Sequence, residues 1–323
     1  MKRRGFLSLI GLGVACPALS RAQQQPTLGL LSSGEMADWA IKPFRAGLKE
    51  SGYVEGGNLT VIYRSADNQF DRLPALAAEL VKSQVSVIFA TGSPVPARSA
   101  KAATATIPIV FAYGGDPVGD GLVTSFNRPG GNVTGATFIG TALTAKRMEL
   151  FREVLPKVSD VALLVNPKGT LAQAQIAEAT AAAQELRLTL HIINASSESE
   201  FDEAFAAMSR LKVGAFFPST DPLFGLNGRG LHVTMAYRYK IPAICNGRVD
   251  AVAGGLFSYG PDLPDTWRQA GVYVGRILKG EKASELPVVQ PAKFELVINL
   301  KTAKLLGIDI PPGLLIRADE VIE

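Results

Sequence analysis

The sequence has few of the residues that build metal and redox sites. Its 323 residues include two cysteines and two histidines, and His191 and His232 lie far apart in the chain. Zinc sites and Cys–His nucleophile pairs need several such residues, most of them closely spaced. We therefore expect no metal site, and we expect His191 and His232 to be structural or surface residues. Cys16 falls in a segment that is expected to be removed, so Cys245 is left without a partner for a disulfide.

The short motifs of nucleotide sites and hydrolases are also missing. No Gly-Lys-Ser/Thr follows a glycine-rich loop, and Gly115, Gly119 and Gly121 do not have the G-x-G-x-x-G spacing of a dinucleotide site. No G-x-S-x-G nucleophile elbow occurs. We therefore predict no cofactor, and the interpretation as an enzyme lacks an evident nucleophile, metal set and cofactor loop.

Apolar runs long enough to cross a membrane are absent, and the run at the start of the chain is too short to do so. Residues 1–22 read MKRRGFLSLIGLGVACPALSRA, with a basic start, an apolar run over 6–15 and small residues before Ala22. This pattern predicts a secretory signal cleaved after Ala22, and hence a periplasmic protein that is not embedded in the membrane. RRGFLSL resembles the twin-arginine export motif, and an ordinary secretory signal is the alternative. A lipid anchor at Cys16 is less favoured, because Gly13 stands where such signals carry leucine.

A basic surface is also missing once this segment is removed. The full chain has 33 Lys and Arg against 29 Asp and Glu. Cleavage removes Lys2, Arg3, Arg4 and Arg21, and so leaves 29 basic residues against 29 acidic ones. A formally neutral chain without a basic patch predicts no nucleic-acid partner.

What the sequence does contain is a regular alternation of strand and helix patterns. In two successive series, short apolar runs typical of buried strands alternate with segments whose apolar residues have the spacing of a helix. Each series predicts a parallel sheet covered by helices on both faces. We predict an α/β fold of two doubly wound parallel-sheet lobes, joined by a multi-strand hinge. The N-terminal lobe is expected to comprise residues 27–138 and 259–286, and the C-terminal lobe residues 139–258 and 287–323.

Open α/β sheets bind ligands at the carboxyl ends of their strands, and those ends are rich in small, polar and aromatic residues. Hydroxyls and amides there suit a carboxylate, Asp116, Asp221 and Asp250 suit an ammonium group, and aromatic rings suit an apolar group. Taken singly, the Ser, Thr and Asp residues are better explained as helix caps, and Asp116 before Pro117 as a turn residue. The candidate ligand-binding residues are Ser32, Ser33, Trp39, Thr91, Gly92, Ser93, Tyr113, Asp116, Phe138, Asn166, Thr220, Asp221, Asn246, Arg248 and Tyr259.

Several segments resemble a known family. They are FRAGLKESGYVEGGNLTVIYRSADNQFDRLPALAAELV, IPIVFAYGGDPVGDGLVTSFNRPGGNVTG, GAFFPSTD and ELVINLKTAKLLGI. They resemble bacterial ABC-transporter substrate-binding proteins of the periplasmic-binding type I fold, in the branch that includes tryptophan- and tyrosine-type proteins. The resemblance implies two lobes joined by three crossovers, one small solute in the cleft and no catalytic residues. It maps ligand contacts onto Ser33, residues 91–94, Asp116, Thr220, Asp221 and Asn246.

Two departures from that branch leave the ligand open. The second loop reads TGSPVP, and Arg248 stands where the branch tends to have an acidic or small residue. A cation there favours a plain carboxylate over a zwitterion. Amino acids and small aromatic or aliphatic acids both remain candidates.

We therefore predict an exported, monomeric solute-binding protein that closes on its ligand and delivers it to an ABC permease and its ATPase. Two alternatives stay open at this point. One is a secreted enzyme that uses Asp116 or Asp221 as a base. The other is a binding module that feeds a sensor kinase.

Overall fold

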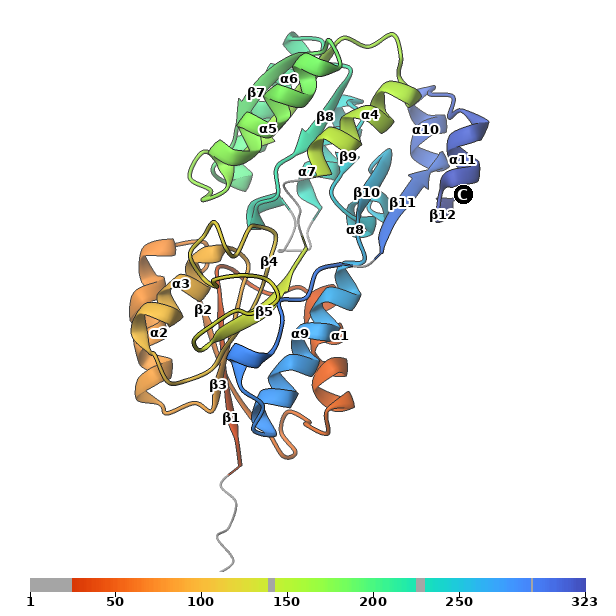
Figure 1. Cartoon of the computed structure of the whole chain (residues 1–323). Helices are drawn as coiled ribbons and strands as arrows, with labels where there is room; N and C mark the ends of the chain where they lie inside the picture. Colours follow the sequence, from red (N-terminus) through yellow and green to blue (C-terminus); the bar gives the residue numbers. More distant parts are fainter. Residues whose placement is uncertain (1–24, 139–142, 225–229, 292) are drawn as a thin grey trace, which may run out of the picture.

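The computed structural model describes residues 25–138, 143–224, 230–291 and 293–323. The predicted signal segment, its cleavage site and Cys16 lie outside the described residues. The described chain forms two lobes, one above the other in Figure 1, and the chain crosses between them after residue 138, near residues 261–263 and after residue 289.

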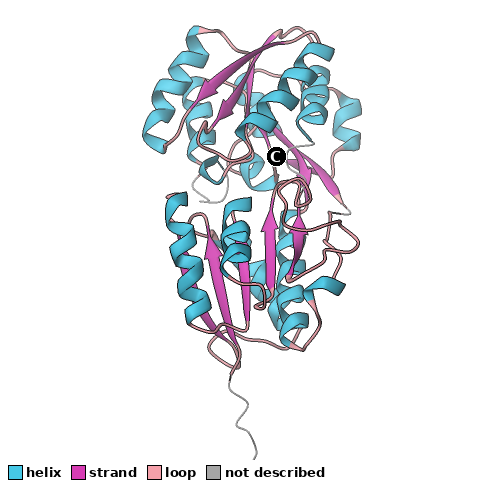
Figure 2. Ribbon diagram, turned by 60° about the vertical axis from the view of Figure 1, so that its left-hand side comes forward, coloured by secondary structure: helices cyan, strands magenta, loops and turns pink. Residues whose placement is uncertain are grey.

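The first lobe is built on a five-stranded parallel sheet with the strand order β2-β1-β3-β4-β5. The order 2-1-3-4-5 is that of a doubly wound open sheet, which confirms the expected fold class for this half of the chain. Figure 2 shows these strands pointing toward the second lobe, so their carboxyl ends face it. The strands are β1 (Thr27–Ser32), β2 (Thr60–Ser65), β3 (Val87–Thr91), β4 (Ile109–Tyr113) and β5 (Val133–Thr137).

Helices cover both faces of this sheet. On one face, α1 (Asp38–Glu50) and α9 (Leu263–Leu278) bury a core in which Phe44 stacks on Phe89 with ring centroids 4.2 Å apart. On the other face, α2 (Leu73–Lys82) and α3 (Pro94–Ala103) bury a second core. The central strands β3 and β4 are buried on both sides, which explains their largely apolar sequences.

The second lobe has a three-stranded parallel sheet, β7-β6-β8, and a four-stranded sheet, β12-β11-β10-β9. A single bridge between Phe216 and Ala243 joins the two. The strands are β6 (Asp160–Val165), β7 (Thr189–Asn194), β8 (Ala215–Pro218), β9 (Ile244–Cys245), β10 (Phe257–Pro261), β11 (Phe294–Asn299) and β12 (Glu320–Ile322).

Two further cores complete the second lobe. One lies beneath α4 (Thr144–Val154), α5 (Ala172–Glu185), α10 (Leu300–Leu306) and α11 (Pro312–Arg317). The other lies beneath α6 (Phe201–Arg210) and α7 (Leu231–Tyr239). The short helix α8 (Arg248–Val252) contacts β9, β10 and β11.

Two strands depart from the expected parallel pattern, because β11 runs antiparallel to β10 and β12 pairs parallel with β11. The reason is the path of the chain. β10 ends at the edge that faces the first lobe, the chain enters that lobe to form α9, and it returns to the same edge to begin β11. A strand that re-enters at the edge where its neighbour left must run in the opposite direction.

The pairings also bear on the lobe boundaries. All of β10 pairs within the second lobe, and Val289 forms a bridge with Ala136 at the end of β5. We therefore propose that the second and third crossovers between the lobes lie near residues 262 and 290, a few residues after the expected boundaries 258/259 and 286/287. The physical reason is that strand pairing, which sequence patterns do not reveal, decides where a segment belongs.

Candidate functional site

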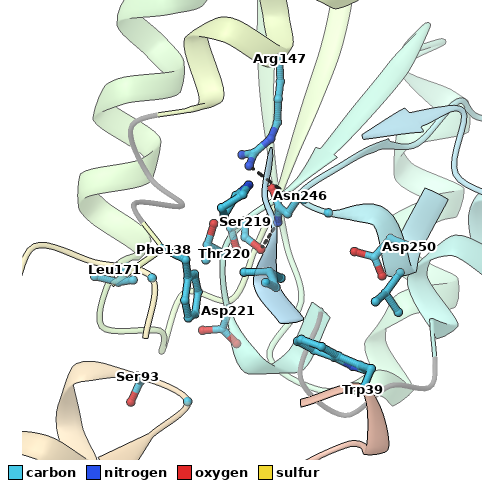
Figure 3. Close-up of a pocket in the computed structure, with 16 residues that line it drawn as sticks. Trp39, Ser93, Phe138, Arg147, Leu171, Ser219, Thr220, Asp221, Asn246 and Asp250 are labelled. Atoms are coloured by element: carbon cyan, nitrogen blue, oxygen red, sulfur yellow. Dashed lines mark hydrogen bonds between the residues drawn. The ribbon is translucent and has the colours of Figure 1, made fainter. Parts of the chain in front are cut away.

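A cavity lies where the two lobes meet, and residues from both lobes line it (Figure 3). Its walls are largely apolar, with a small number of charged groups. Small-molecule sites generally have this composition. The lining residues are Trp39, Gly92, Ser93, Gly114, Phe138, Arg147, Leu171, Ser219, Thr220, Asp221, Asn246, Gly247, Val249, Asp250, Pro261 and Leu263.

The loop after β3 brings Gly92 and Ser93 to the cavity. Gly92 has φ +101°, and a Cβ there would lie 2.9 Å from that of Ser33, so the loop needs glycine. The Ser93 hydroxyl accepts a hydrogen bond from the backbone N–H of Val95 at the start of α3, and its Oγ is 2.8 Å from Ser33 Oγ. Ser93 is therefore a helix cap whose position also exposes it to the cavity.

Gly114 and Phe138 form the point where the first lobe approaches the second. A Cβ at Gly114 would lie 2.6 Å from Phe138 Cε2 and 3.0 Å from Thr220 Cγ2. Thr220 follows β8 of the second lobe, so this contact joins the lobes. Because residue 114 is glycine, the loop after β4 can approach the loop after β8 this closely.

The loop after β8 is held rigidly by α5 and by the loop after β6. Buried Gln175 of α5 accepts a hydrogen bond from the Thr220 N–H (2.7 Å) and donates one to the Thr220 carbonyl (3.2 Å). Asp221 Oδ1 accepts from Asn166 Nδ2 at 3.2 Å and from the Leu223 N–H at 3.0 Å. These contacts place Ser219, Thr220 and Asp221 along one wall.

Arg147 brings a buried positive charge to the cavity from α4. Its side chain is 3% exposed, its Nε donates to the Tyr259 carbonyl at 2.7 Å, and its Nη2 lies 3.4 Å from the Asn246 carbonyl. Asn246 in turn donates to the carbonyls of Pro218 and Ser219. Burial lowers the pKa of Arg147 to about 10, so the guanidinium remains charged at neutral pH.

Two carboxylates lie near this guanidinium. Burial raises the pKa of Asp250 to about 7, and that of Glu178, whose Oε1 accepts from the Thr144 N–H at 3.3 Å, also to about 7. In both cases the charge of Arg147 opposes the rise. His232 Nε2 lies 3.7 Å from Asp250 Oδ1, and burial lowers the pKa of His232 to about 4, so the imidazole is neutral.

The structure brings seven of the candidate residues together at this cavity. They are Trp39, Gly92, Ser93, Phe138, Thr220, Asp221 and Asn246. Three others lie directly behind them. Ser33 contacts Ser93, Asn166 contacts Asp221, and the carbonyl of Tyr259 holds Arg147.

The remaining candidates do not line this cavity. Asp116 is exposed and accepts a hydrogen bond from the Val118 N–H, so its carboxylate caps its own turn. Arg248 forms a two-point contact with Glu320 and lines a separate hollow beside this cavity. Tyr113 is buried and donates to Asp120. Thr91 donates to the Ala112 carbonyl, and Ser32 is the buried last residue of β1.

The sequence reasoning missed Arg147 and the apolar residues Leu171, Val249, Pro261 and Leu263. Strand-end reasoning could not find Arg147, because it lies inside a helix. A signal was present, since Arg147 stands on the apolar side of its helix beside Met148 and Phe151. A charge on a buried helix face has to be satisfied by a partner or a ligand.

Within the described ranges, no group of three or more His, Cys, Asp or Glu side chains is placed to hold a metal ion. None of the described helices is long and apolar enough to cross a membrane.

Comparison with known proteins identifies the family. The model of the ABC transporter substrate binding protein family matches residues 31–322. A tyrosine-binding protein of Clostridioides difficile is 26% identical over 287 residues, which cover 89% of this chain and 82% of that protein.

Two solved structures are similar over 92% of this chain and 100% of their own. One is an ABC domain from Streptococcus pneumoniae in complex with L-Trp, with a TM-score of 0.81 and 25% identity. The other is a conserved domain protein from Vibrio cholerae, with a TM-score of 0.82 and 27% identity. A ligand-free, open substrate-binding protein from Clostridium difficile has a TM-score of 0.64 and 22% identity, with 92% of this chain and 99% of that chain covered. The chain therefore belongs to the ABC transporter substrate binding protein family, whose members bind a solute outside the cytoplasm and are not enzymes.

Proposed function

We propose that this protein captures an amino acid with a large apolar side chain in the interlobe cavity and delivers it to an ABC permease. The observation that carries the proposal is the cavity itself. It combines apolar walls from both lobes with one buried cation, Arg147, and two acidic groups, Asp221 and Asp250.

The apolar walls suit an aromatic side chain. Trp39 and Phe138 come from the first lobe, and Leu171 and Val249 from the second. Trp39 is supported from behind by an edge-on contact with fully buried Trp267, with ring centroids 6.2 Å apart. Rigid aromatic walls bind planar groups at low cost in conformational entropy.

The charged groups suit a zwitterion. A carboxylate is expected to lie near Arg147 and an ammonium group near the acidic residues, since buried charges in a cavity are stabilised by opposite charges. The similarity to a tyrosine-binding protein and to a structure in complex with L-Trp supports an aromatic amino acid as ligand.

The cellular setting is part of the proposal. Residues 1–22 direct export to the periplasm, by the twin-arginine or the ordinary secretory route. The mature monomer then presents its closed form to a permease and its ATPase. The outer faces of both lobes form the contact surface, because only a surface spanning both lobes distinguishes the closed form from the open one.

The test is calorimetric titration of the mature chain with the amino acids and with small aromatic acids. We expect saturable one-to-one binding of one or a few aromatic amino acids. Phe138→Ala should weaken that binding, whereas Tyr237→Ala, which removes an aromatic ring that is 60% exposed, should not. Binding of organic acids without any binding of amino acids would contradict the proposal.

A further inference from the structure

Resting on the function just proposed, we propose that Asp250 binds the ammonium group of the ligand, and that this contact makes the cavity selective for amine-bearing ligands. The inference concerns one of two acidic residues in the cavity wall, and the choice between them follows from their contacts.

The carboxylate of Asp250 has unused hydrogen-bonding capacity. It lies on α8, lines the cavity and has a side chain that is 14% exposed. No described residue donates a hydrogen bond to it, and the 3.7 Å that separates His232 Nε2 from Asp250 Oδ1 is too long for one. A nearly buried carboxylate without a donor is costly, and a ligand ammonium would supply both donors and charge.

Asp221 differs in this respect. Its Oδ1 already accepts two hydrogen bonds, from Asn166 Nδ2 and from the Leu223 N–H. These contacts hold the loop after β8 in place. Asp221 is therefore a structural hydrogen-bond acceptor in the cavity wall, and its Oδ1 is already satisfied without a ligand.

The charges around Asp250 also leave it uncompensated. Among the described residues, the titratable groups that face this cluster are Arg147 from α4, Glu178 from α5, His232 from α7, Cys245 from β9 and Tyr259 from β10. His232 is neutral, and burial raises the pKa of the Cys245 thiol, so it is neutral as well. Arg147 is shared between Asp250 and Glu178. With both carboxylates ionised, the cluster therefore carries one excess negative charge, which favours the ammonium end of a zwitterion on the side of Asp250.

The directions of approach fit a zwitterion. Figure 3 shows Arg147 reaching down from α4 above Asn246, and Asp250 on the other side of Asn246, above Trp39. Phe138 and Leu171 lie on the side away from Asp250. Different parts of the wall therefore present the positive charge, the negative charge and the apolar groups.

The experiment compares three probes by calorimetry. They are L-tryptophan, indole-3-propionate, which lacks the amine, and tryptamine, which lacks the carboxylate. L-tyrosine and its desamino acid replace them if L-tryptophan does not bind. Each probe is titrated into the wild-type mature chain, Asp250→Asn and the matched variant Asp221→Asn.

We expect Asp250→Asn to weaken L-tryptophan binding by about 30-fold or more, as is typical when one partner of a buried charge pair is removed. Binding of indole-3-propionate should change by less than about threefold, because this ligand has no ammonium group to contact Asp250. Asp221→Asn should shift both ligands by a similar factor, because it loosens the wall without removing the ammonium partner.

A second measurement needs no variant. Because the pKa of Asp250 is about 7, its ionised fraction rises about tenfold between pH 6 and pH 8. Wild-type affinity for L-tryptophan should rise by about the same factor over this range, and affinity for indole-3-propionate should not. Burial also raises the pKa of Asp221, so if Asp250→Asn does not fold, the same pH comparison is made with Asp221→Asn, in which only Asp250 of the two remains to titrate.

The outcomes are separable. If the wild type binds no amino acid, the proposed function fails. If it binds L-tryptophan or L-tyrosine but Asp250→Asn binds equally well, or if affinity for the amine ligand does not rise with pH, the assignment of Asp250 is overturned and the proposed function stands.

Discussion

Single residues decide how closely the two lobes approach one another, and Gly114 is the clearest case. A Cβ at this position would contact Phe138 within its own lobe and Thr220 of the other lobe. Gly114→Ala should therefore hinder closure and weaken ligand affinity by about tenfold or more, since overpacking costs about 1–3 kcal/mol. Calorimetry measures the effect.

The control for Gly114→Ala is Gly313→Ala in α11, where a Cβ would meet nothing within 4 Å. That change should leave ligand affinity unaltered. Equal affinity of Gly114→Ala and the wild type would show that the lobes do not meet at Gly114 in the complex.

The raised pKa values of Asp250 and Glu178 predict how the stability of the ligand-free protein depends on pH. Both pKa values rise on folding from about 4 to about 7. The folded state therefore binds more protons than the unfolded state between these values. The free energy of unfolding should fall as pH rises from about 4.5 to about 7.5, by up to about 3 kcal/mol for Asp250 alone.

Urea unfolding at several pH values tests this expectation. Asp250→Asn and Glu178→Gln should each reduce the fall in the free energy of unfolding with rising pH. Carboxylates whose pKa is lowered act only below this window; examples are Asp67, which accepts hydrogen bonds from Ser65 and Arg72, and Glu281, which is paired with Arg276. A free energy of unfolding that rises across the window would contradict the assignment.

At the scale of elements, the contact between α1 and α9 depends on glycine. A Cβ at Gly47 would lie 1.9 Å from the Arg268 carbonyl oxygen, and one at Gly271 would lie 2.1 Å from the Phe44 carbonyl oxygen. The two helices, far apart in sequence, therefore pack backbone against backbone. This contact holds α9, which lies between the second and third crossovers, against the first lobe.

Gly271→Ala should separate the helices and lower the free energy of unfolding by about 1–3 kcal/mol. In an isolated helix the same change would be stabilising, by about 1 kcal/mol. Gly313→Ala, in an uncrowded helix, is again the matched control and should be neutral or slightly stabilising. If both variants were equally stable in urea unfolding, close packing of α1 on α9 would be excluded.

At the scale of the whole molecule, the cavity exists only while the lobes are together. Both lobes supply its walls, so a ligand bound there stabilises the closed arrangement. We expect the radius of gyration from small-angle scattering to fall when the ligand is added. A ligand at 100 times its Kd should also raise the free energy of unfolding by about 2.7 kcal/mol.

The control for this measurement is a polar amino acid that shows no binding in calorimetry, which should leave both values unchanged. Binding without compaction would mean that the lobes are already fixed. The protein would then be a rigid receptor and would not signal occupancy by closing.

Much of the fold followed from local patterns. Apolar runs such as residues 87–91 and 109–113 are buried on both faces, and alternating helices cover them, so two doubly wound lobes could be predicted from periodicity. The strand-end rule also located Ser93, Thr220, Asp221 and Asn246. Topology forces the carboxyl ends of parallel strands to one edge, whatever the details of packing.

The tertiary structure alone decided which side chains face the ligand cavity. Asp116 and Asp250 look alike in sequence, but the first caps its own turn and the second lies in the cavity wall without a hydrogen-bond donor among the described residues. Arg147 lies inside a helix, and its place beside Asn246 depends on how α4 packs against β10. Patterns along a chain specify which elements form, because the apolar periodicity of a strand or helix and the hydrogen bonds within a helix are local in sequence. Contacts between residues about 100 positions apart depend on packing, and packing is set only when the whole chain has folded.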